Sequence, residues 1–381
     1  MMRKNFFGLL TVAALACLLA AGCGSAGADE DSSAAMSSSG TEEEAAEEST
    51  AVYAGDEEGE YIGEIFAMDT YMTLTAYGEN AREAVEAGIK EIERLDDLLS
   101  TGTESSEVAQ INASGGGEMS EDTAYLAERA LEIWESTGGA FDITIYPVMD
   151  LWGFTTGDFA VPDEEELAQT LALVDAGSLE ITEDEDGTAV LSMAEGQEID
   201  FGGIAKGYAS SRVMEIFEEY GVESAIISLG GNVHVLGAKT DGSEWRVGIQ
   251  DPDDEEGYLG ALAVTDTAVI TSGGYERYFE DEETGEIYHH IIDPSTGYSA
   301  DSGLISVTIV SADSTLADGL STALFVMGTE EAVAYCEEHC TEYGFDAFLE
   351  TEDGDFYITD NLEDAFIDLN GNTKLNIIET E

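Results

Sequence analysis

The sequence predicts an α+β fold in one large domain, and three observations support this prediction. Strand-like and helix-like segments do not alternate regularly along the chain, which disfavours a doubly wound parallel sheet. The second half of the chain alternates short strand-like segments with Gly-rich turns. The composition does not change between about Tyr61 and about Leu369, and no internal repeat is visible. We therefore expect a single domain with mixed or antiparallel sheets and packed helices.

The N-terminus has the layout of a secretory signal. Arg3 and Lys4 precede an apolar run over residues 6–21, which is short for a membrane-spanning helix of about 20 apolar residues. The run ends in Ala-Ala-Gly-Cys, which resembles the lipobox of bacterial lipoproteins, and ordinary signal cleavage is the alternative. Residues 1–22 are therefore predicted to be a lipoprotein signal peptide. Cys23 would be lipidated, and the exported protein would be anchored to the extracytoplasmic side of a bacterial membrane.

Residues 23–58 are predicted to be a flexible linker. Most of this segment consists of Ser, Ala, Gly, Glu and Asp, which cannot bury enough apolar surface to order the chain. Such a composition suits a tether between a membrane anchor and a folded domain. The folded domain is then predicted to cover residues 59–369, followed by a C-terminal tail over residues 370–381.

The charge of the chain excludes two classes of partner. The 381 residues include 83 acidic and 12 basic ones, for a net charge of -71. Binding to nucleic acid depends on Lys and Arg neutralising phosphates, so we expect no nucleic-acid partner. Electrostatic binding to anionic lipid heads is disfavoured for the same reason. Acidic residues are spread over the whole chain, so solubility or a salty environment explains them better than a functional acidic patch.

The first half of the domain is predicted to begin with a β-hairpin and to continue mainly with helices. Residues 61–78 are rich in β-branched and aromatic residues and predict two strands joined near Asp69. Ala81–Ser100 has apolar residues at helical spacing. The remaining predicted elements are helices over Asp122–Thr137, Glu164–Leu173 and Gly207–Tyr220, and a hairpin over Leu179–Ile199 that turns at Glu-Asp-Glu-Asp-Gly.

The second half is predicted to contain most of the strands and two further helices. The predicted strands are Ser224–Ser228, Val233–Leu236, Trp245–Ile249, Gly260–Val264, Ala268–Thr271 and Ser306–Val310. The predicted helices are Thr315–Met327 and Glu330–Glu342, and a terminal hairpin joins Phe345–Leu349 to Asp355–Thr359 around Asp353-Gly354.

The segment DFGGIAKGYA, residues 200–209, places one of only five lysines in a Gly-rich loop before a helix. Small residues allow the backbone to approach a ligand closely, and the free N–H groups of a helix N-terminus favour an anion. Lys206 would add a point charge suited to phosphate. The segment matches neither of the common phosphate-binding glycine motifs, so a capped helix with a solvated lysine is the alternative interpretation.

The segment ADGLSTALFVMG, residues 317–328, carries a candidate metal-ligand pair. Asp318 and Thr322 are four residues apart, which places a carboxylate and a hydroxyl on one face of a helix. Mg²⁺ prefers hard oxygen ligands and takes only a few of them from the protein. The alternatives are a first-turn acid that faces the helix dipole and a threonine packed in the core.

Two further groups of residues have candidate chemistry. Segments 228–232 (SLGGN) and 271–279 (TSGGYERYF) end strand-like runs with paired glycines, and HHIIDPSTGYSA (289–300) joins two adjacent histidines to a turn. Four Gly-rich strand ends suggest a site assembled from several loops. Cys336 and Cys340 flank His339. The pattern allows a metal site, a disulfide or helix positions without chemistry, and we expect the last.

The set of segments resembles the ApbE family, the FAD:protein FMN transferases. The resemblance is carried by MDTYMTL (68–74), GGAFDITIYPVMDLWGF (138–154), DFGGIAKGYA, SLGGN, TSGGYERYF, HHIIDPSTGY and ADGLSTALFVMG, which occur in the family's order from Met68 to Gly328. It implies a T-fold-like α+β catalytic domain that uses FAD as its substrate and Mg²⁺ as its cofactor.

The resemblance also implies roles for particular residues. Met68, Ala140, Phe141 and Asp142 would line the flavin and adenine side of the pocket. Asp200 and Lys206 would contact the nucleotide, and Ile292 would pack against it. Asp318, Thr322 and the carbonyl of Gly203 would hold the metal, with Ser321 as an additional contact. His290 matches the histidine proposed as the general base, whereas His289 has no such match.

The implied reaction is the attack of a threonine hydroxyl of an acceptor protein on the FMN-side phosphorus of FAD. It would form a phosphoester bond and release AMP. Hydrolysis of FAD to FMN and AMP, or flavin binding without catalysis, are the alternatives. The sequence departs from the pattern at Gly102, where an aromatic residue is common, and at Asn232, where an acid is also common and the change is expected to matter little. The chain contains no flavin-acceptor motif, so the acceptor is expected to be another exported protein.

Overall fold

The computed structural model describes residues 51–55, 59–252, 254–282, 284–371 and 373–380. The predicted signal peptide, Cys23 and most of the predicted linker lie outside the described residues. Within the part of the chain that is described, no helix has the length and apolar character that crossing a membrane requires.

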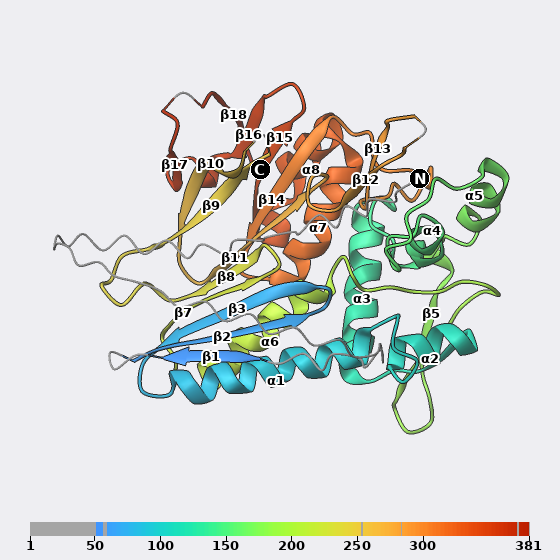
Figure 1. Cartoon of the computed structure of the whole chain (residues 1–381), viewed down its shortest axis with the longest axis horizontal. Coiled ribbons are helices and arrows are strands. Elements are labelled where there is room, and N and C mark those ends of the chain that lie inside the picture. Colours follow the sequence, from blue (N-terminus) through green and yellow to red (C-terminus); the bar gives the residue numbers. More distant parts are fainter. Residues whose placement is uncertain (1–50, 56–58, 253, 283, 372, 381) are drawn as a thin grey trace, which may run out of the picture. The chain divides into compact units, whose positions relative to one another are not determined.

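The centre of the domain is a mixed sheet of ten strands within the described residues (Figure 1). All neighbouring strands are antiparallel except β16 and β18, which are parallel. In spatial order the strands are β1 (Val52–Gly55), β2 (Glu60–Ala67), β3 (Thr70–Tyr77), β7 (Ser224–Leu229), β8 (Asn232–Leu236), β11 (Thr267–Gly273), β14 (Leu304–Ser311), β15 (Phe345–Thr351), β16 (Phe356–Thr359) and β18 (Leu375–Ile378).

Helices cover one face of this sheet. They are α1 (Ala81–Leu99), α6 (Ala205–Glu219), α7 (Ser314–Met327) and α8 (Thr329–Tyr343), and they contact β2 and β3, β7 and β8, β11 and β14, and β15 respectively. The helices pack here because each has one apolar face: in α1 the fully buried residues Val85, Ile89, Ile92 and Leu95 recur at helical spacing. Figure 1 shows α1 running beside β1 and β2.

A small second sheet covers part of the opposite face. It consists of β17 (Phe366–Asp368), β10 (Asp254–Val264) and β9 (Trp245–Asp251). Val247 and Leu262 of this sheet pack with Val269 and Phe348 of the central sheet in a separate apolar cluster. The central strands are therefore buried on both faces, which explains why β14 is buried at almost every position.

The remaining elements lie at the periphery. They include α2 (Glu107–Ser114), α3 (Glu121–Ser136), α4 (Tyr146–Leu151), α5 (Glu164–Leu171), the sheet β4-β6-β5 (Gly116–Glu118, Ala189–Ser192, Glu180–Glu183), the hairpin β12-β13 (Tyr278–Glu280, Ile287–His289) and the 3-10 turns Ile143–Ile145, Ala176–Ser178 and Asp360–Leu362.

The predicted α+β fold is confirmed, and most predicted elements occur within two residues of their expected bounds. Helix α6 begins at Ala205 rather than at Gly207, so Lys206 lies in its first turn and not in the preceding loop. Helices α2 and α4 were not predicted, because each is short and neither shows a repeating apolar pattern.

The structure places strands in two segments that the sequence assigned to a linker and a tail. Strand β1 lies within the predicted linker and pairs with β2. Strand β18 lies within the predicted C-terminal tail, pairs with β16 and buries Ile378. Both segments are short and flanked by polar residues, so their strand character depends on pairing partners that are distant in the sequence.

The burial of Ile378 makes the role of β18 testable. Ile378 is 1% exposed and its neighbour Ile377 is 36% exposed. Ile378→Ala should lower the free energy of unfolding by about 2–5 kcal/mol, because it removes buried methyl groups and leaves a cavity. Ile377→Ala, the matched control, should change it by less than about 0.5–1 kcal/mol. Denaturant unfolding followed by tryptophan fluorescence measures both, and equal effects would show that β18 does not belong to the packed domain.

Candidate active site

The candidate site is built where the start of α6 meets α7. Gly207 allows this contact, because a Cβ atom there would lie 2.2 Å from the carbonyl oxygen of Ser314 and 2.6 Å from the Cβ of Asp318. The Gly207 N–H donates to Oδ2 of Asp318 at 2.7 Å, and the Ser314 hydroxyl donates to the Gly207 carbonyl at 2.7 Å. The two helices are thus joined by reciprocal hydrogen bonds at the position of Asp318.

Asp318 is a buried carboxylate, 4% exposed, with a second partner on the central sheet. The amide of Asn232, the first residue of β8, donates to Oδ1 of Asp318 at 2.9 Å. Three elements therefore determine where this carboxylate lies, namely α6, α7 and β8.

The hydroxyl groups of Thr322 and Ser321 differ in how strongly they are hydrogen-bonded within the protein. Ser321 is fully buried, donates to the carbonyl of Asp318 at 2.8 Å and lies 2.7 Å from the hydroxyl of Ser272. Thr322 is half-buried, and its single hydroxyl contact, to Ser272, is long at 3.4 Å. The Thr322 oxygen is thus the freer ligand, one turn along α7 from Asp318.

Lys206 lies in the first turn of α6, where a cation opposes the helix dipole. Its Nζ donates to the carbonyl of Gly202 at 3.4 Å. The positive charge of Lys206 lowers the pKa of Asp200 and of Glu276, although desolvation raises both overall. Both acids therefore lie near Lys206. A cation at a helix N-terminus is electrostatically unfavourable, and such local conflicts are typical of functional sites.

Glu276 has an exposed side chain and Asp200 is half-buried, and the surrounding protein desolvates both carboxyl groups. Desolvation by the surrounding protein raises the pKa of Glu276 to about 7, and the charge of Asp318 raises it further while Lys206 opposes the shift. Desolvation also raises the pKa of Asp200, against the Gly202 N–H that donates to its Oδ1 at 3.0 Å. Lys206 therefore lies beside two acids whose charged forms are disfavoured by desolvation.

His290 follows β13 and has a defined tautomer. Its Nδ1 lies 3.1 Å from the carbonyl of Arg277, which also accepts its backbone N–H at 3.0 Å. A carbonyl can only accept, so Nδ1 carries the hydrogen and the lone pair is on Nε2. Within the described residues no hydrogen bond involves Nε2. The site therefore holds a histidine with a free, basic nitrogen.

The pKa of His290 is lower than the value near 6.5 that the sequence-based interpretation assumed. Desolvation lowers it to about 3, and the charges of Arg277 and Lys206 contribute in the same direction. The charge of Lys206 thus acts on Asp200, Glu276 and His290 alike, which indicates that the structure brings these residues together.

Three of the residues predicted to line the flavin pocket, Phe141, Ala140 and Met68, lie in two different loops. Phe141 packs against Gly203, since a Cβ atom there would lie 2.9 Å from its ring. Ala140 is half-buried beside it. Met68 has a φ of 47°, a strained value for this residue type, and its backbone is hydrogen-bonded to Asp96. Phe141 thus lies beside the segment that precedes α6, whereas Met68 lies in a second loop, beside α1.

Two other predicted contacts are engaged within the protein. The Asp142 carboxylate accepts from the backbone N–H groups of Thr144 and Ala176 at 2.7 and 3.0 Å, and from the Thr144 hydroxyl. It holds two loops together. Ile292 is 5% exposed and packs in an apolar cluster with Trp152 and Phe154. Its side chain supports the segment that carries His290.

The donor set fits a magnesium ion of the kind that completes its shell with phosphate and water. Within the described residues no group of three or more His, Cys, Asp or Glu side chains could hold a metal. Asp318 supplies one carboxylate and Thr322 one hydroxyl on the same face of α7. A single carboxylate with neutral oxygens matches the few protein ligands that Mg²⁺ uses beside a phosphate.

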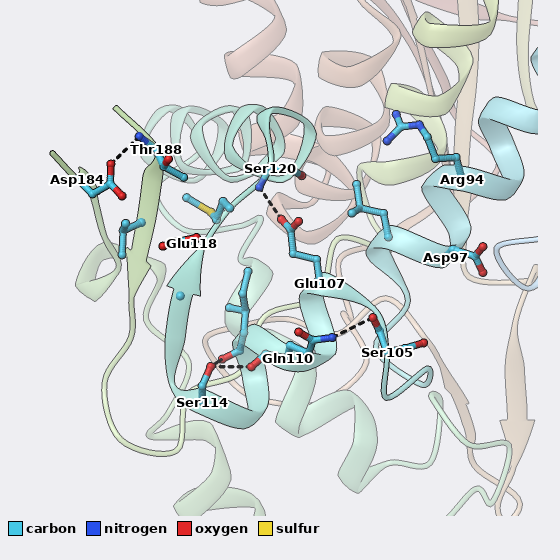
Figure 2. A pocket seen from close by; sticks show the side chains of 15 residues that line it. Arg94, Asp97, Ser105, Glu107, Gln110, Ser114, Glu118, Ser120, Asp184 and Thr188 are labelled. Carbon is cyan, nitrogen blue, oxygen red and sulfur yellow. Dashed lines mark hydrogen bonds between the residues drawn. The ribbon is translucent and has the colours of Figure 1, made fainter. Parts of the chain in front are cut away.

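A hollow of about 1060 Å³ lies elsewhere, between α1, α2, β4 and residues 184–190 (Figure 2). It contains none of the predicted site residues. Its lining includes Asp97, Glu107, Glu118 and Asp184, and its one arginine, Arg94, is paired with Glu91 and Asp122. An acidic lining without a free cation disfavours phosphate, so this hollow is not the candidate site.

Three of the following residues were not singled out from the sequence, and the role of the fourth, Asn232, was underestimated. Glu276 and Arg277 lie within the quoted segment TSGGYERYF, where two adjacent charges in a Gly-rich, aromatic run were the available signal. Asn232 was expected to matter little, although it holds Asp318. The hydroxyl of Tyr146 on α4 is hydrogen-bonded to Thr101, the residue before Gly102.

Cys336 and Cys340 are free and buried on α8, so the disulfide alternative is not formed. A hydrogen bond with Cys336 and burial both raise the pKa of the Cys340 thiol. A protonated, buried thiol is unreactive, in agreement with the prediction of helix positions without chemistry.

Comparison with known proteins identifies related sequences and structures. The model of the ApbE family matches residues 68–347. A FAD:protein FMN transferase of Klebsiella pneumoniae (strain 342) is 37% identical over 247 residues, covering 64% of this chain and 75% of that protein. One of Treponema pallidum (strain Nichols) is 33% identical over 300 residues, covering 73% and 82%. The crystal structure of the ApbE protein of Thermotoga maritima aligns with a TM-score of 0.74 at 32% identity, covering 80% of this chain and 99% of that one.

The close approach at Gly207 makes a specific prediction. Gly207→Ala should force α6 away from α7 and break the hydrogen bond to Asp318, at a cost of about 1–3 kcal/mol or more. Gly102→Ala is the control, because the nearest atom to a Cβ there is 4.0 Å away. Thermal unfolding of both variants measures the difference. A Gly207→Ala protein as stable as Gly102→Ala would contradict the described contact.

The lowered pKa of His290 predicts that its imidazole stays neutral in the ligand-free protein from pH 8 down to pH 5. A histidine is protonated only below its pKa, so lowering the pKa to about 3 preserves the neutral form across this range, whereas an unperturbed one titrates near 6.5. Heteronuclear NMR of the histidine side chains, assigned with His290→Ala, measures it. A midpoint between pH 6 and 7 would contradict the described environment.

Proposed function

Because this chain belongs to the ApbE family and is a flavin transferase, we propose that it transfers FMN from FAD to a threonine hydroxyl of an acceptor protein in a Mg²⁺-dependent reaction. The reaction would form a phosphoester bond and release AMP. The observation that carries the proposal is the gathering of Lys206, the Asp318–Thr322 pair and the free Nε2 of His290 around the start of α6.

Lys206 and the start of α6 would bind the pyrophosphate of FAD. The N–H groups of Ala205 and Gly207 are already bonded to the Phe201 carbonyl and the Asp318 carboxylate, so the Lys206 ammonium would supply the main positive charge to the phosphates. In a chain with a net charge of -71 an anionic ligand needs such a concentrated positive region. The raised pKa values of Asp200 and Glu276 support this role, because desolvation disfavours the negative charge of both carboxyl groups beside Lys206.

Asp318, Thr322 and the carbonyl of Gly203 would hold the Mg²⁺ ion, with Ser321 supporting α7 from within. When bound, the ion would polarise the phosphate oxygens and neutralise charge on the leaving AMP. The protein contributes the position of the carboxylate, which is set by hydrogen bonds from two other elements.

His290 would act as the general base. Its Nε2 would accept the proton of the acceptor hydroxyl as the new O–P bond forms and the P–O bond to AMP breaks. The Arg277 carbonyl would keep the ring in the required tautomer. A pKa of about 3 makes a weak base in the free enzyme, and a bound pyrophosphate would raise it, because a nearby negative charge favours the imidazolium.

We also propose that the protein is exported and anchored through a lipid on Cys23. The proposal depends on the N-terminal sequence pattern. Cys23→Ser should move the protein from the membrane fraction to the soluble exported fraction, and an unchanged distribution would exclude the anchor.

The proposed reaction is tested by incubating the enzyme with FAD, Mg²⁺ and an acceptor domain. The acceptor should gain the mass of FMN minus water, and chelation of Mg²⁺ should abolish the gain. Asp318→Ala should also abolish it. His290→Ala should lower the rate by about 100- to 10,000-fold while FAD binding persists.

His339→Ala, which alters a histidine of α8, is the control and should keep the wild-type rate. AMP release that does not depend on the acceptor would favour the alternative, FAD hydrolysis with water as the nucleophile. Flavin binding without any turnover in the wild type would leave only the non-catalytic alternative. Full activity of Asp318→Ala would contradict the metal assignment.

A further inference from the structure

Asn232 is the only side chain outside α7 that hydrogen-bonds the carboxylate of Asp318 within the described residues. Both residues are buried, at 3% and 4% exposure, and the contact measures 2.9 Å. The partners are 86 residues apart in the sequence, so the bond links the central sheet to α7.

The orientation of the Asn232 amide follows from the chemistry of its partner. An ionised carboxylate only accepts hydrogen bonds, so the NH₂ group of Asn232 must face Asp318. The Gly207 N–H occupies one lone pair of Oδ2, and Asn232 occupies one of Oδ1. A carboxylate has about four lone-pair positions, so one position on each oxygen stays available for a cation.

The position of Asn232 is set by a tight turn. Strands β7 and β8 are joined by Gly230 and Gly231, whose φ values are 61° and 96°. A Cβ atom on Gly230 would lie 2.5 Å from the Thr70 hydroxyl, and its N–H donates to Tyr71 of β3 at 3.1 Å. Asn232 is therefore the first residue after a two-residue turn that is packed against a neighbouring strand, which leaves its side chain little freedom.

We propose that Asn232 is a positioning residue, whose amide holds the Asp318 carboxylate in the orientation that binds a divalent cation. The inference rests on the proposed Mg²⁺ site and adds to it a residue that does not touch the ion. A neutral amide suits the position, because it supplies a donor without adding charge. A carboxylate in its place could only donate if it held a proton, and two ionised acids at 2.9 Å would repel each other.

The test uses Asn232→Leu, which keeps the side-chain volume and removes the donor. The affinity for Mn²⁺ in the presence of FAD is measured by electron paramagnetic resonance, and the affinity for FAD alone by flavin fluorescence. Loss of an outer hydrogen bond to a ligand should weaken Mn²⁺ binding by about 10- to 100-fold. FAD binding without metal should change less than about twofold. Saturating Mg²⁺ should restore turnover toward the wild-type value, since only the metal affinity is altered.

Asn376→Leu is the matched control. Asn376 lies on β18 and donates to the Phe356 carbonyl at 3.1 Å, so its loss removes an amide hydrogen bond elsewhere in the same sheet. It should leave Mn²⁺ affinity unchanged. If Asn232→Leu does not fold, Asn232→Ser replaces it, because the shorter hydroxyl cannot span the same distance, and the same weakening is expected.

Each outcome decides the inference. Weakened Mn²⁺ binding in the Asn232 variant alone supports it. Wild-type Mn²⁺ affinity in the Asn232 variant overturns it and leaves the proposed function intact. Equal weakening in the Asn376 control overturns it as well, because the effect would then follow from stability. Absence of Mn²⁺ binding in the wild type would overturn the metal site and this inference together.

Discussion

The buried carboxylate of Asp318 is the constraint on which the rest of the site depends. A charge at 4% exposure must be paired or hydrogen-bonded, and here donors come from the start of α6 and from β8. The same contacts bring Lys206 to the face that carries Thr322. Gly207 is required for this arrangement, because any side chain there would separate the two helices. The stability of the fold and the geometry of the site therefore depend on the same few contacts.

Because the chain is strongly acidic, the few positive charges at the site matter more for its electrostatics. Lys206 stands against the dipole of its own helix and beside two acids whose pKa values are raised by desolvation. Such an arrangement costs stability in the absence of a ligand. In the proposed reaction, a pyrophosphate and a divalent cation that bind together would offset this cost, because their charges would compensate one another.

The position of His290 depends on packing contacts outside the candidate site. Ile292 and Trp152 belong to a satellite apolar cluster, and the Arg277 guanidinium donates to the Phe154 carbonyl in the same region. These contacts hold the backbone carbonyl of Arg277 where it receives the Nδ1 hydrogen of His290. The tautomer of His290, the proposed base, therefore depends on an apolar cluster that lies outside the candidate site.

The sequence by itself determined the α+β class, most of the strands and helices, and the candidate residues Lys206, Asp318, Thr322 and His290. The elements follow from apolar periodicity, and Lys206, Asp318 and Thr322 from short motifs, which are local properties of the chain. The choice of His290 over His289 came from the resemblance to the ApbE family. Tertiary structure decided the rest. Strand β18 exists because β16 offers it a partner, and the pKa of His290 falls because distant segments desolvate it. Asn232 became important only when folding placed it 2.9 Å from a residue 86 positions away, a distance that no local pattern encodes.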